Sequence, residues 1–212
     1  GIDLEQVDTV VLSHGHLDHT WGLDPLIRLY TEAAAARTLP RLVAHPEVFS
    51  GREADAPPEV GELLSRERLG AHFELHLTVE PLWLSDRLVF LGAVPRELSF
   101  EPTAEEVPED SALAYRSEAG LVVLTGCAHA GICNIVEHAR RVTGEDRVAD
   151  IVGGLHLLDP PAERLRRTVE YIAGLELEAM HPCHCTDLAS KVALAAAAPV
   201  ADVGVGLRLT YP

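Results

Sequence analysis

Three histidines and one aspartate fall within six positions directly after a short apolar run, and this stretch constrains the fold more than any other part of the sequence. The run is Thr9–Ser13 (TVVLS), and its β-branched, apolar residues predict a strand that is buried on both faces. The cluster that follows it consists of His14, His16, Asp18 and His19 (HGHLDH). Because imidazole is a common metal ligand and an aspartate adds a hard oxygen, the sequence predicts a metal site at a strand end. A turn after the strand would let His14 and His16 face one way and Asp18 and His19 another, which suits two ions.

The segments around this loop predict an α/β domain. In the first half we expect a helix with Asp24 as its N-cap and Pro25 at its first position, running to about residue 36. It is followed by a strand at 41–46, a short helix at 58–64 and a meander of short antiparallel strands from residue 73. In the second half the expected strands are 121–124, 149–152, 177–181 and 203–209, and the expected helices are 132–142, 161–173 and 188–198. We therefore expect a single domain over residues 1–212.

Three further histidines follow predicted strands. His129 comes after LVVLTGCA, His156 after DIVGGL and His184 after LEAMHPC. Loops at strand ends present reactive groups in an α/β scaffold, because the buried strands fix their positions while the loops stay accessible. One isolated histidine would be read as a surface loop residue, but this many at strand ends favours a joint role. We expect the four loops to converge on one site.

Composition excludes several partners. The 33 acidic and 17 basic side chains give a formal net charge of -16, which repels a phosphate backbone, so we expect no nucleic-acid partner. The apolar stretches are too short for a membrane span, so we expect no membrane partner. Because neither a membrane span nor a signal segment is visible, a cytoplasmic location is the simplest expectation. Four cysteines in two close pairs indicate reduced thiols, and CxC lacks the spacing of a zinc knuckle. The acidic run at 105–110 is expected to be a solvated loop.

The motif HGHLDH resembles the HxHxDH motif of the metallo-β-lactamase superfamily. Other segments resemble one branch of it, the metal-dependent hydrolases related to 7,8-dihydropterin-6-methyl-4-(β-D-ribofuranosyl)aminobenzene 5'-phosphate synthase. These segments are VVLTGCAHAGICNI, IVGGLHLL, HPCHCTD and LGAVPRELSFEP, which are similar to GCSHAGxxNI, GGFHL, PCHCTG and GEIPR. The similarity extends over nearly the whole chain. It implies an α/β fold in which two mixed β-sheets flanked by helices form an αββα sandwich that holds one or two metal ions at the sheet edge.

The resemblance also implies roles for individual residues. The implied ligands of one ion are His14, His16 and His129, and those of a second ion are Asp18, His19 and His184. His156 stands where many members have a bridging aspartate. Since an imidazole cannot bridge two ions as a carboxylate does, His156 would be a ligand of one ion or a hydrogen-bond donor to substrate, and we favour the substrate role. Arg96 would bind an anionic group of the substrate, with a surface ion pair as the alternative.

The chain begins directly before its first predicted strand, whereas members of the superfamily have strands ahead of HxHxDH. We therefore expect some N-terminal strands of one sheet to be missing. The edge exposed in this way would be an aggregation or dimerisation surface, and so a homo-oligomer is one expected outcome.

The expected activity follows from the metal ions. We expect two divalent ions, with Zn2+ as the first expectation and iron or manganese as alternatives. Such ions lower the pKa of bound water, so a hydroxide would attack an ester or phosphoester of a small, phosphorylated or pterin-like metabolite. Asp18 is the expected catalytic residue, which orients the water or accepts its proton. The alternatives are a metal-binding fragment with impaired catalysis and a nuclease of the same fold, which the net charge disfavours.

Overall fold

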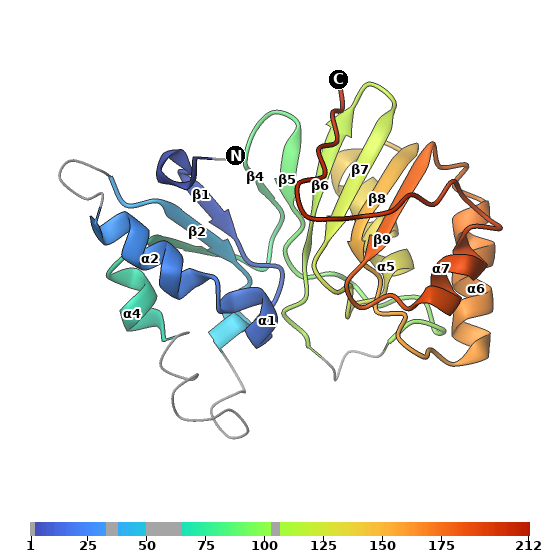
Figure 1. The fold of residues 1–212 in the computed structure, drawn as a ribbon, viewed down its shortest axis with the longest axis horizontal. Coiled ribbons are helices and arrows are strands. Elements are labelled where there is room, and N and C mark those ends of the chain that lie inside the picture. Colours follow the sequence, from blue (N-terminus) through green and yellow to red (C-terminus); the bar gives the residue numbers. More distant parts are fainter. Residues whose placement is uncertain (1–2, 33–37, 50–64, 103–106) are drawn as a thin grey trace. The chain divides into compact units, whose positions relative to one another are not determined.

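The computed structural model describes residues 3–32, 38–49, 65–102 and 107–212. The chain divides into two compact units, residues 1–79 and 80–212, and each has its own β-sheet and its own hydrophobic core (Figure 1). The helix predicted at 58–64 lies outside the described residues. The expectation of one domain over the whole chain stays a prediction.

The first unit contains a three-stranded parallel sheet. Its strands, in order, are β1 (Thr9–Val11), β2 (Arg41–Ala44) and β3 (Glu74–Leu77). Leu42 in the central strand pairs with Val10 on one side and Leu75 on the other, and it has no exposed surface. The strands predicted after Asp8 and after Pro40 are therefore confirmed. The prediction of an antiparallel meander from residue 73 is wrong for its first strand, because β3 pairs parallel with β2. Because all three strands run the same way, the loops after β1 and β2 leave the sheet at the same edge.

Short helices cover this sheet. They are η1 (Leu4–Gln6), α1 (Leu17–Thr20), α2 (Leu23–Glu32), η2 (Pro46–Phe49) and α4 (Arg66–Gly70). Helix α2 buries Leu23, Ile27 and Tyr30, which recur at helical spacing along one face. The prediction that Asp24 is an N-cap is wrong, because the helix begins at Leu23. The Asp24 carboxylate instead forms ion pairs with Arg28 and Arg68.

The second unit contains a six-stranded mixed sheet. Its strands, in order, are β4 (Leu82–Trp83), β5 (Leu88–Phe90), β6 (Ala112–Ser117), β7 (Gly120–Thr125), β8 (Val148–Gly154) and β9 (Ala179–Cys183). Neighbours from β4 to β7 are antiparallel, whereas β7, β8 and β9 are parallel. The carboxyl ends of these three parallel strands therefore lie at one edge of the sheet, where the fold can bring their loops together.

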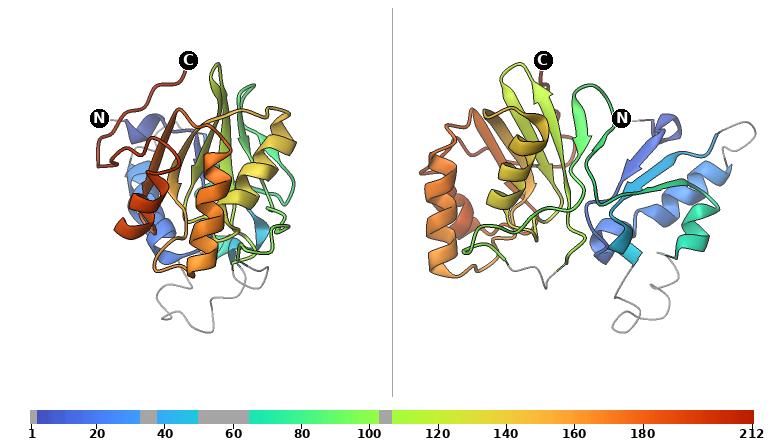
Figure 2. Two further views of the ribbon diagram at one scale, coloured as in Figure 1. Left: turned by 90° about the vertical axis from the view of Figure 1, so that its right-hand side faces the viewer. Right: turned by 180° about the vertical axis from the view of Figure 1, so that it is seen from behind.

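Two helices connect the parallel strands, α5 (Ile132–Thr143) between β7 and β8 and α6 (Ala162–Ala173) between β8 and β9. Helix α7 (Leu188–Leu194) follows β9. Figure 2 shows α5 and α6 on one face of the six-stranded sheet, and both contribute fully buried side chains to its core, Ile135 from α5 and Ile172 from α6. Alternating strands and helices in the second half were predicted correctly up to this point. Among the described residues no helix combines the length and the apolar character needed to cross a membrane.

Two predictions near the C-terminus are wrong. Helix α7 ends at Leu194 rather than at 198, and Pro199 explains why the helix cannot extend to the residue before it. The segment 203–209 is not a strand. Its apolar residues Val203 and Leu207 instead line a cavity of about 560 Å³ together with side chains of the sheet. Val205, between these two residues, is fully exposed, so the alternation of apolar residues did not indicate a strand.

Candidate metal centre

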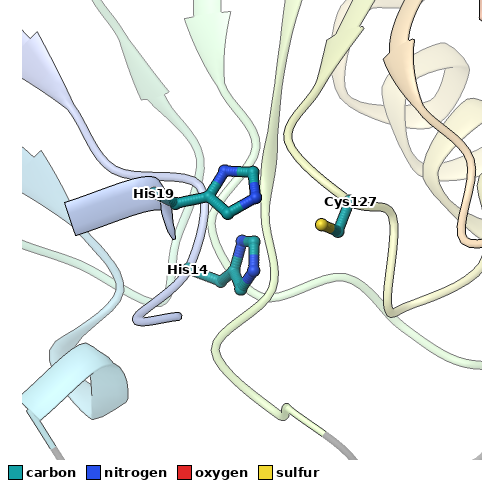
Figure 3. Close-up of side chains that lie close together, drawn as sticks. All are labelled: His14, His19 and Cys127. Carbon is teal, nitrogen blue, oxygen red and sulfur yellow. The ribbon is translucent and has the colours of Figure 1, made fainter. Parts of the chain in front are cut away.

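The HGHLDH loop of the first unit brings its three imidazole rings together. His14 Nε2 lies 2.9 Å from His16 Nδ1. The ring centroids of His14 and His19 are 4.3 Å apart, and Figure 3 shows these two rings beside each other. Ser13 Oγ lies 3.0 Å from His14 Nδ1, which leaves Nε2 of that ring directed toward its neighbours. The loop therefore concentrates nitrogen donors, as the sequence predicted.

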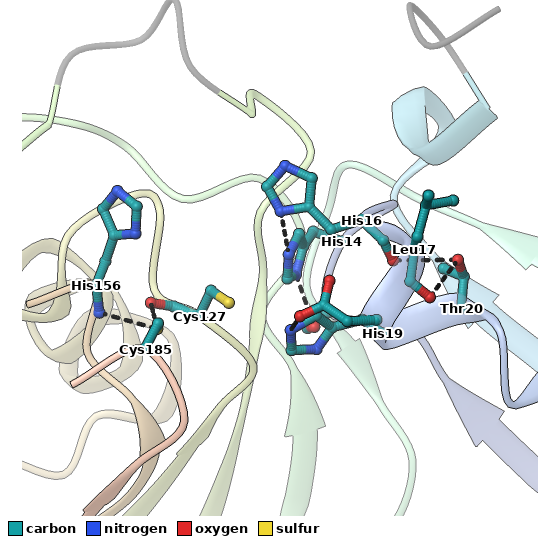
Figure 4. Close-up of polar contacts among 10 residues, drawn as sticks. His14, His16, Leu17, His19, Thr20, Cys127, His156 and Cys185 are labelled. Atoms are coloured by element: carbon teal, nitrogen blue, oxygen red, sulfur yellow. Dashed lines mark hydrogen bonds and ion pairs between the residues drawn. The ribbon is translucent and has the colours of Figure 1, made fainter. Parts of the chain in front are cut away.

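The local fold explains this arrangement. Strand β1 is followed by Leu12, whose N–H donates to the Val43 carbonyl (3.0 Å) and so anchors the start of the loop to the sheet. The single-turn helix α1 then begins after His16, and the Thr20 hydroxyl donates to the His16 carbonyl (3.1 Å) (Figure 4). That turn places Asp18 beside His19, with 3.4 Å between Oδ2 and Nε2. The Asp18 side chain is 58% exposed, so solvent and substrate can reach it.

The donor set fits a divalent metal ion. Two nitrogens bound to one tetrahedral Zn2+ at about 2.0–2.1 Å lie roughly 3.3 Å apart. The 2.9 Å between His14 Nε2 and His16 Nδ1 is close to that separation. A neutral imidazole pair at this distance shares one hydrogen bond, and an ion would replace it with two coordinate bonds.

In the second unit, each of the three parallel strands is followed by a residue with left-handed backbone. These residues are Ala128 after β7 (φ 59°), His156 after β8 (φ 53°) and His184 after β9 (φ 53°). This conformation is unfavourable for a residue with a Cβ and is concentrated at functional sites. The strand-end histidines of the second unit thus lie on sharply turned loops at one sheet edge.

His129 and His156 lie next to each other at this edge, with ring centroids 4.3 Å apart. Arg96 holds the first of these loops, because its guanidinium donates to the carbonyls of His129 (3.1 Å) and Val107 (2.7 Å). Two of its donors are therefore used in positioning the His129 loop. Substrate binding by Arg96 and His156 stays a prediction.

Two cysteines accompany His184. The sulfur atoms of Cys127 and Cys185 and one ring nitrogen of His184 all lie within 4.8 Å of one another. Figure 4 shows how Cys185 is held, since its thiol donates to the Cys127 carbonyl and its sulfur accepts the His156 N–H, both at 3.3 Å. Hydrogen bonding with the Cys127 thiol, followed by that from His156, lowers the pKa of Cys185 to about 4. Sequence reasoning gave these cysteines no ligand role, because neighbours from different loops leave no spacing pattern.

The expectation of a solvated acidic loop at 105–110 is wrong at its C-terminal end. Glu109 and Asp110 are 3% and 1% exposed. Asp110 Oδ2 accepts the Ala130 N–H (2.9 Å), directly after His129, and burial raises the pKa of Asp110 to about 7. The sequence signal that could have predicted the burial of Asp110 is the strand that begins two residues later, because residues next to a buried strand are often buried themselves.

A second buried carboxylate fixes the helix that follows His129. Glu101 Oε1 accepts the Cys133 N–H (2.9 Å) at the start of α5, and Oε2 lies 3.5 Å from Arg164 Nε. Gly131 is required at this point, because its φ is 90° and a Cβ there would lie 2.6 Å from the Glu101 carboxyl group. The carboxylate supplies the acceptor that a glycine N-cap lacks.

Sequence reasoning also left out His45. It follows β2 and lies at the same sheet edge as the His14 loop. It is 5% exposed, and its Nδ1 accepts the Glu47 N–H (3.2 Å). Its position at the end of a predicted strand is the sequence signal that could have added His45 to the candidate site residues.

Comparisons with known proteins bear on both the fold and this site. The family model described as the metallo-beta-lactamase superfamily matches residues 1–184. The chain is 28% identical, over 208 residues, to the 7,8-dihydropterin-6-methyl-4-(beta-D-ribofuranosyl)-aminobenzene-5'-phosphate synthase of Methanocaldococcus jannaschii, covering 87% of this chain and 68% of that protein.

Two solved structures have a similar fold. Tm1679, a metal-dependent hydrolase of the β-lactamase superfamily, has a TM-score of 0.74 at 23% identity, over 99% of this chain and 81% of that one. The Zn(2+)-bound PqqB of Methylobacterium extorquens has a TM-score of 0.51 at 15% identity, over 95% of this chain and 73% of that one. At these identities the likeness concerns the fold alone.

Proposed function

Because the chain belongs to the metallo-β-lactamase superfamily, we propose that it is a metal-dependent hydrolase of ester or phosphoester bonds in small metabolites. The observation that carries this proposal is the HGHLDH loop, whose imidazole nitrogens converge directly after β1. Support from the second unit comes from histidine-bearing loops that follow β7, β8 and β9 at one sheet edge. Nitrogen and carboxylate donors in this number suit divalent ions such as Zn2+, with iron and manganese as alternatives.

The proposal assigns the ligands as the resemblance implies. One ion is bound by His14, His16 and His129, and the second by Asp18, His19 and His184. When bound, such ions activate water and polarise the oxygen of the bond to be cleaved.

Other residues of the chain complete the chemistry. The exposed carboxylate of Asp18 orients the attacking water or accepts its proton. The imidazole of His156, beside His129, donates a hydrogen bond to the substrate. Arg96 fixes the His129 loop through its carbonyl and would bind an anionic part of the substrate.

The substrate class is part of the proposal. The name of the relative from M. jannaschii describes a phosphorylated, pterin-containing compound, and that supports a phosphorylated or pterin-like substrate for this chain. The net charge of -16 argues against a nucleic acid. A cytoplasmic location and a homo-oligomeric state remain part of the same proposal.

The test is the hydrolysis of a generic phosphodiester, bis(p-nitrophenyl) phosphate, and of an activated ester by protein loaded with Zn2+, iron or manganese. Replacing Asp18 with Ala should lower kcat/KM by roughly 10²–10⁴-fold, the usual contribution of a positioned acid or base. Asp146→Ala is the matched control, because Asp146 is exposed on the loop before β8. Equal rates for Asp18→Ala and wild type, with metal bound in both, would identify a metal-binding fragment without turnover and overturn the proposal.

A further inference from the structure

Cys127, His184 and Cys185 form a cluster of metal-binding donors that belongs entirely to the second unit. Their ligand atoms lie within 4.8 Å of one another. Two sulfurs and one nitrogen on a single tetrahedral ion are separated by roughly 3.5–3.8 Å. Small side-chain rotations would therefore bring these donors to coordination distance. The two thiols are buried, and His184 is exposed, so the cluster is closed on the protein side and open at the imidazole.

The surroundings of Cys185 resemble those of a metal-bound thiolate. Its sulfur already accepts a backbone N–H, that of His156, at 3.3 Å. Hydrogen bonds of this kind orient a ligand and tune the metal it binds. The sulfur also lies against Gly154, where a Cβ would come within 2.6 Å of it. The absence of a side chain at Gly154 thus makes room for Cys185 to point toward Cys127 and His184.

We propose that Cys127 and Cys185 are ligands, with His184, of a thiolate-bearing metal site in the second unit, and that this site takes Zn2+ or another ion that accepts sulfur. Thiolates select Zn2+ and softer ions over Mn2+ and Mg2+, which prefer oxygen donors. Binding requires both sulfurs as thiolates, so any proton that a thiol still holds is released to water when the ion binds.

This inference deepens the proposed function, and it rests on it through His184, the ligand that both share. Three donors leave one position of a tetrahedral ion, or two of a five-coordinate ion, for further ligands or for water. The ion bound by His184 would then differ from the ion bound by His14 and His16, which has imidazole ligands. The site that contains His184 and the site that contains His14 and His16 should therefore prefer different metals.

The test is the absorption spectrum of the whole protein after titration with Co2+, which substitutes for Zn2+ and gives an intense near-ultraviolet charge-transfer band when it is bound by thiolate. Wild type should show this band, and Cys127→Ser and Cys185→Ser should each weaken it by about half or more. Cys183→Ser is the matched control, because Cys183 precedes His184 but lies outside the donor cluster, and it should leave the band unchanged. A wild-type protein that binds Co2+ without the band would overturn the inference.

X-ray absorption of the unmutated Zn2+ protein gives an independent answer that does not depend on variants folding. The inference predicts sulfur scatterers at about 2.3 Å from zinc, and a first coordination sphere of only nitrogen and oxygen would contradict it. The two proposals can fail separately. Sulfur ligation without hydrolysis would remove the proposed function alone, whereas hydrolysis with no sulfur at the metal would remove this inference alone.

Discussion

The two units build their donor sets in different ways. In the first unit the donors lie within six consecutive positions, on one loop and one turn of helix after β1. In the second unit they come from three loops that are separated by whole helices, and each loop carries a residue with left-handed backbone. The first set is therefore a property of a short segment, whereas the second exists only once the sheet and the two helices between its parallel strands have formed.

This difference predicts which substitutions should disturb each donor set. The HGHLDH loop needs the strand before it and little else, since its neighbours along the chain are its neighbours in space. The His129 loop depends on distant residues, because Arg96 holds its carbonyl, Asp110 accepts the Ala130 N–H and Glu101 caps the following helix. Substitutions far from the donors should therefore harm the second unit more than the first.

The largest effect of this kind should come from Glu101→Ala. The Glu101 side chain is fully buried and that of Arg164 is 12% exposed, so removing the carboxylate leaves a buried guanidinium without its partner and should lower the free energy of unfolding by about 3–5 kcal/mol. The matched change in the first unit, Asp24→Ala, breaks half-exposed ion pairs and should lower it by about 0–1 kcal/mol. Urea denaturation measures both. Losses of equal size would contradict the difference between the units.

Asp110→Asn should change how stability depends on pH. Burial raises the pKa of Asp110 to about 7, whereas the unfolded carboxyl group titrates near 3.8. Between these values the folded protein holds a proton that the unfolded chain has lost, so this group makes folding less favourable as pH rises from about 4 to 7. Asn keeps the acceptor for Ala130 but does not titrate. The free energy of unfolding of Asp110→Asn, measured relative to wild type by urea denaturation, should therefore increase from about pH 4 to about pH 7. A difference that does not change with pH would show that the pKa of Asp110 is not raised by burial.

Arg96→Met should weaken metal binding without removing any ligand. The methionine keeps much of the stem but loses the N–H groups that hold the His129 and Val107 carbonyls. Loss of a group that orients a ligand typically lowers metal affinity by about 10–100-fold. Zn2+ competition with a chromophoric chelator measures this. Arg141→Met is the control, because Arg141 pairs with Glu97 on the surface, and an equal loss there would indicate a general effect of charge.

The smallest effect should come from Ala128→Gly. Ala128 has a φ of 59°, a conformation that glycine adopts without strain. Removing the Cβ should stabilise the folded state by at most about 1 kcal/mol, because the flexible unfolded glycine offsets part of the gain. Thermal denaturation measures the change. A clear loss of stability would mean that packing of the Ala128 methyl group outweighs backbone strain at this strand end.

Much of this fold and of the first donor set could be predicted from the sequence. Buried strands such as Thr9–Val11 and helices such as Ala162–Ala173 follow from composition and periodicity, which are local properties. The HGHLDH cluster is local for the same reason. Sequence reasoning also placed His129, His156 and His184 at strand ends, which the structure confirms.

The rest depended on contacts between distant segments. Asp110 was expected to lie in a solvated acidic loop, and no role was predicted for Glu101, yet both are buried once the sheet and its helices have formed. Cys127 and Cys185 are 58 residues apart, and only the parallel pairing of β7, β8 and β9 brings them together. The segment 203–209 was wrongly predicted to be a strand because its apolar residues alternate, although the segment does not pair with the sheet.

The central claim is the proposal that the HGHLDH loop and the strand-end histidines of the second unit are metal ligands. The most direct measurement is elemental analysis of protein purified without chelator, comparing wild type with His14→Ala/His16→Ala, which removes donors of the first unit, and with His129→Ala/His184→Ala, which removes donors of the second. The claim predicts about two ions per wild-type chain, as in dinuclear hydrolases, and a loss of metal in both double variants. Wild-type protein without zinc, iron or manganese, or full metal content in either double variant, would contradict it.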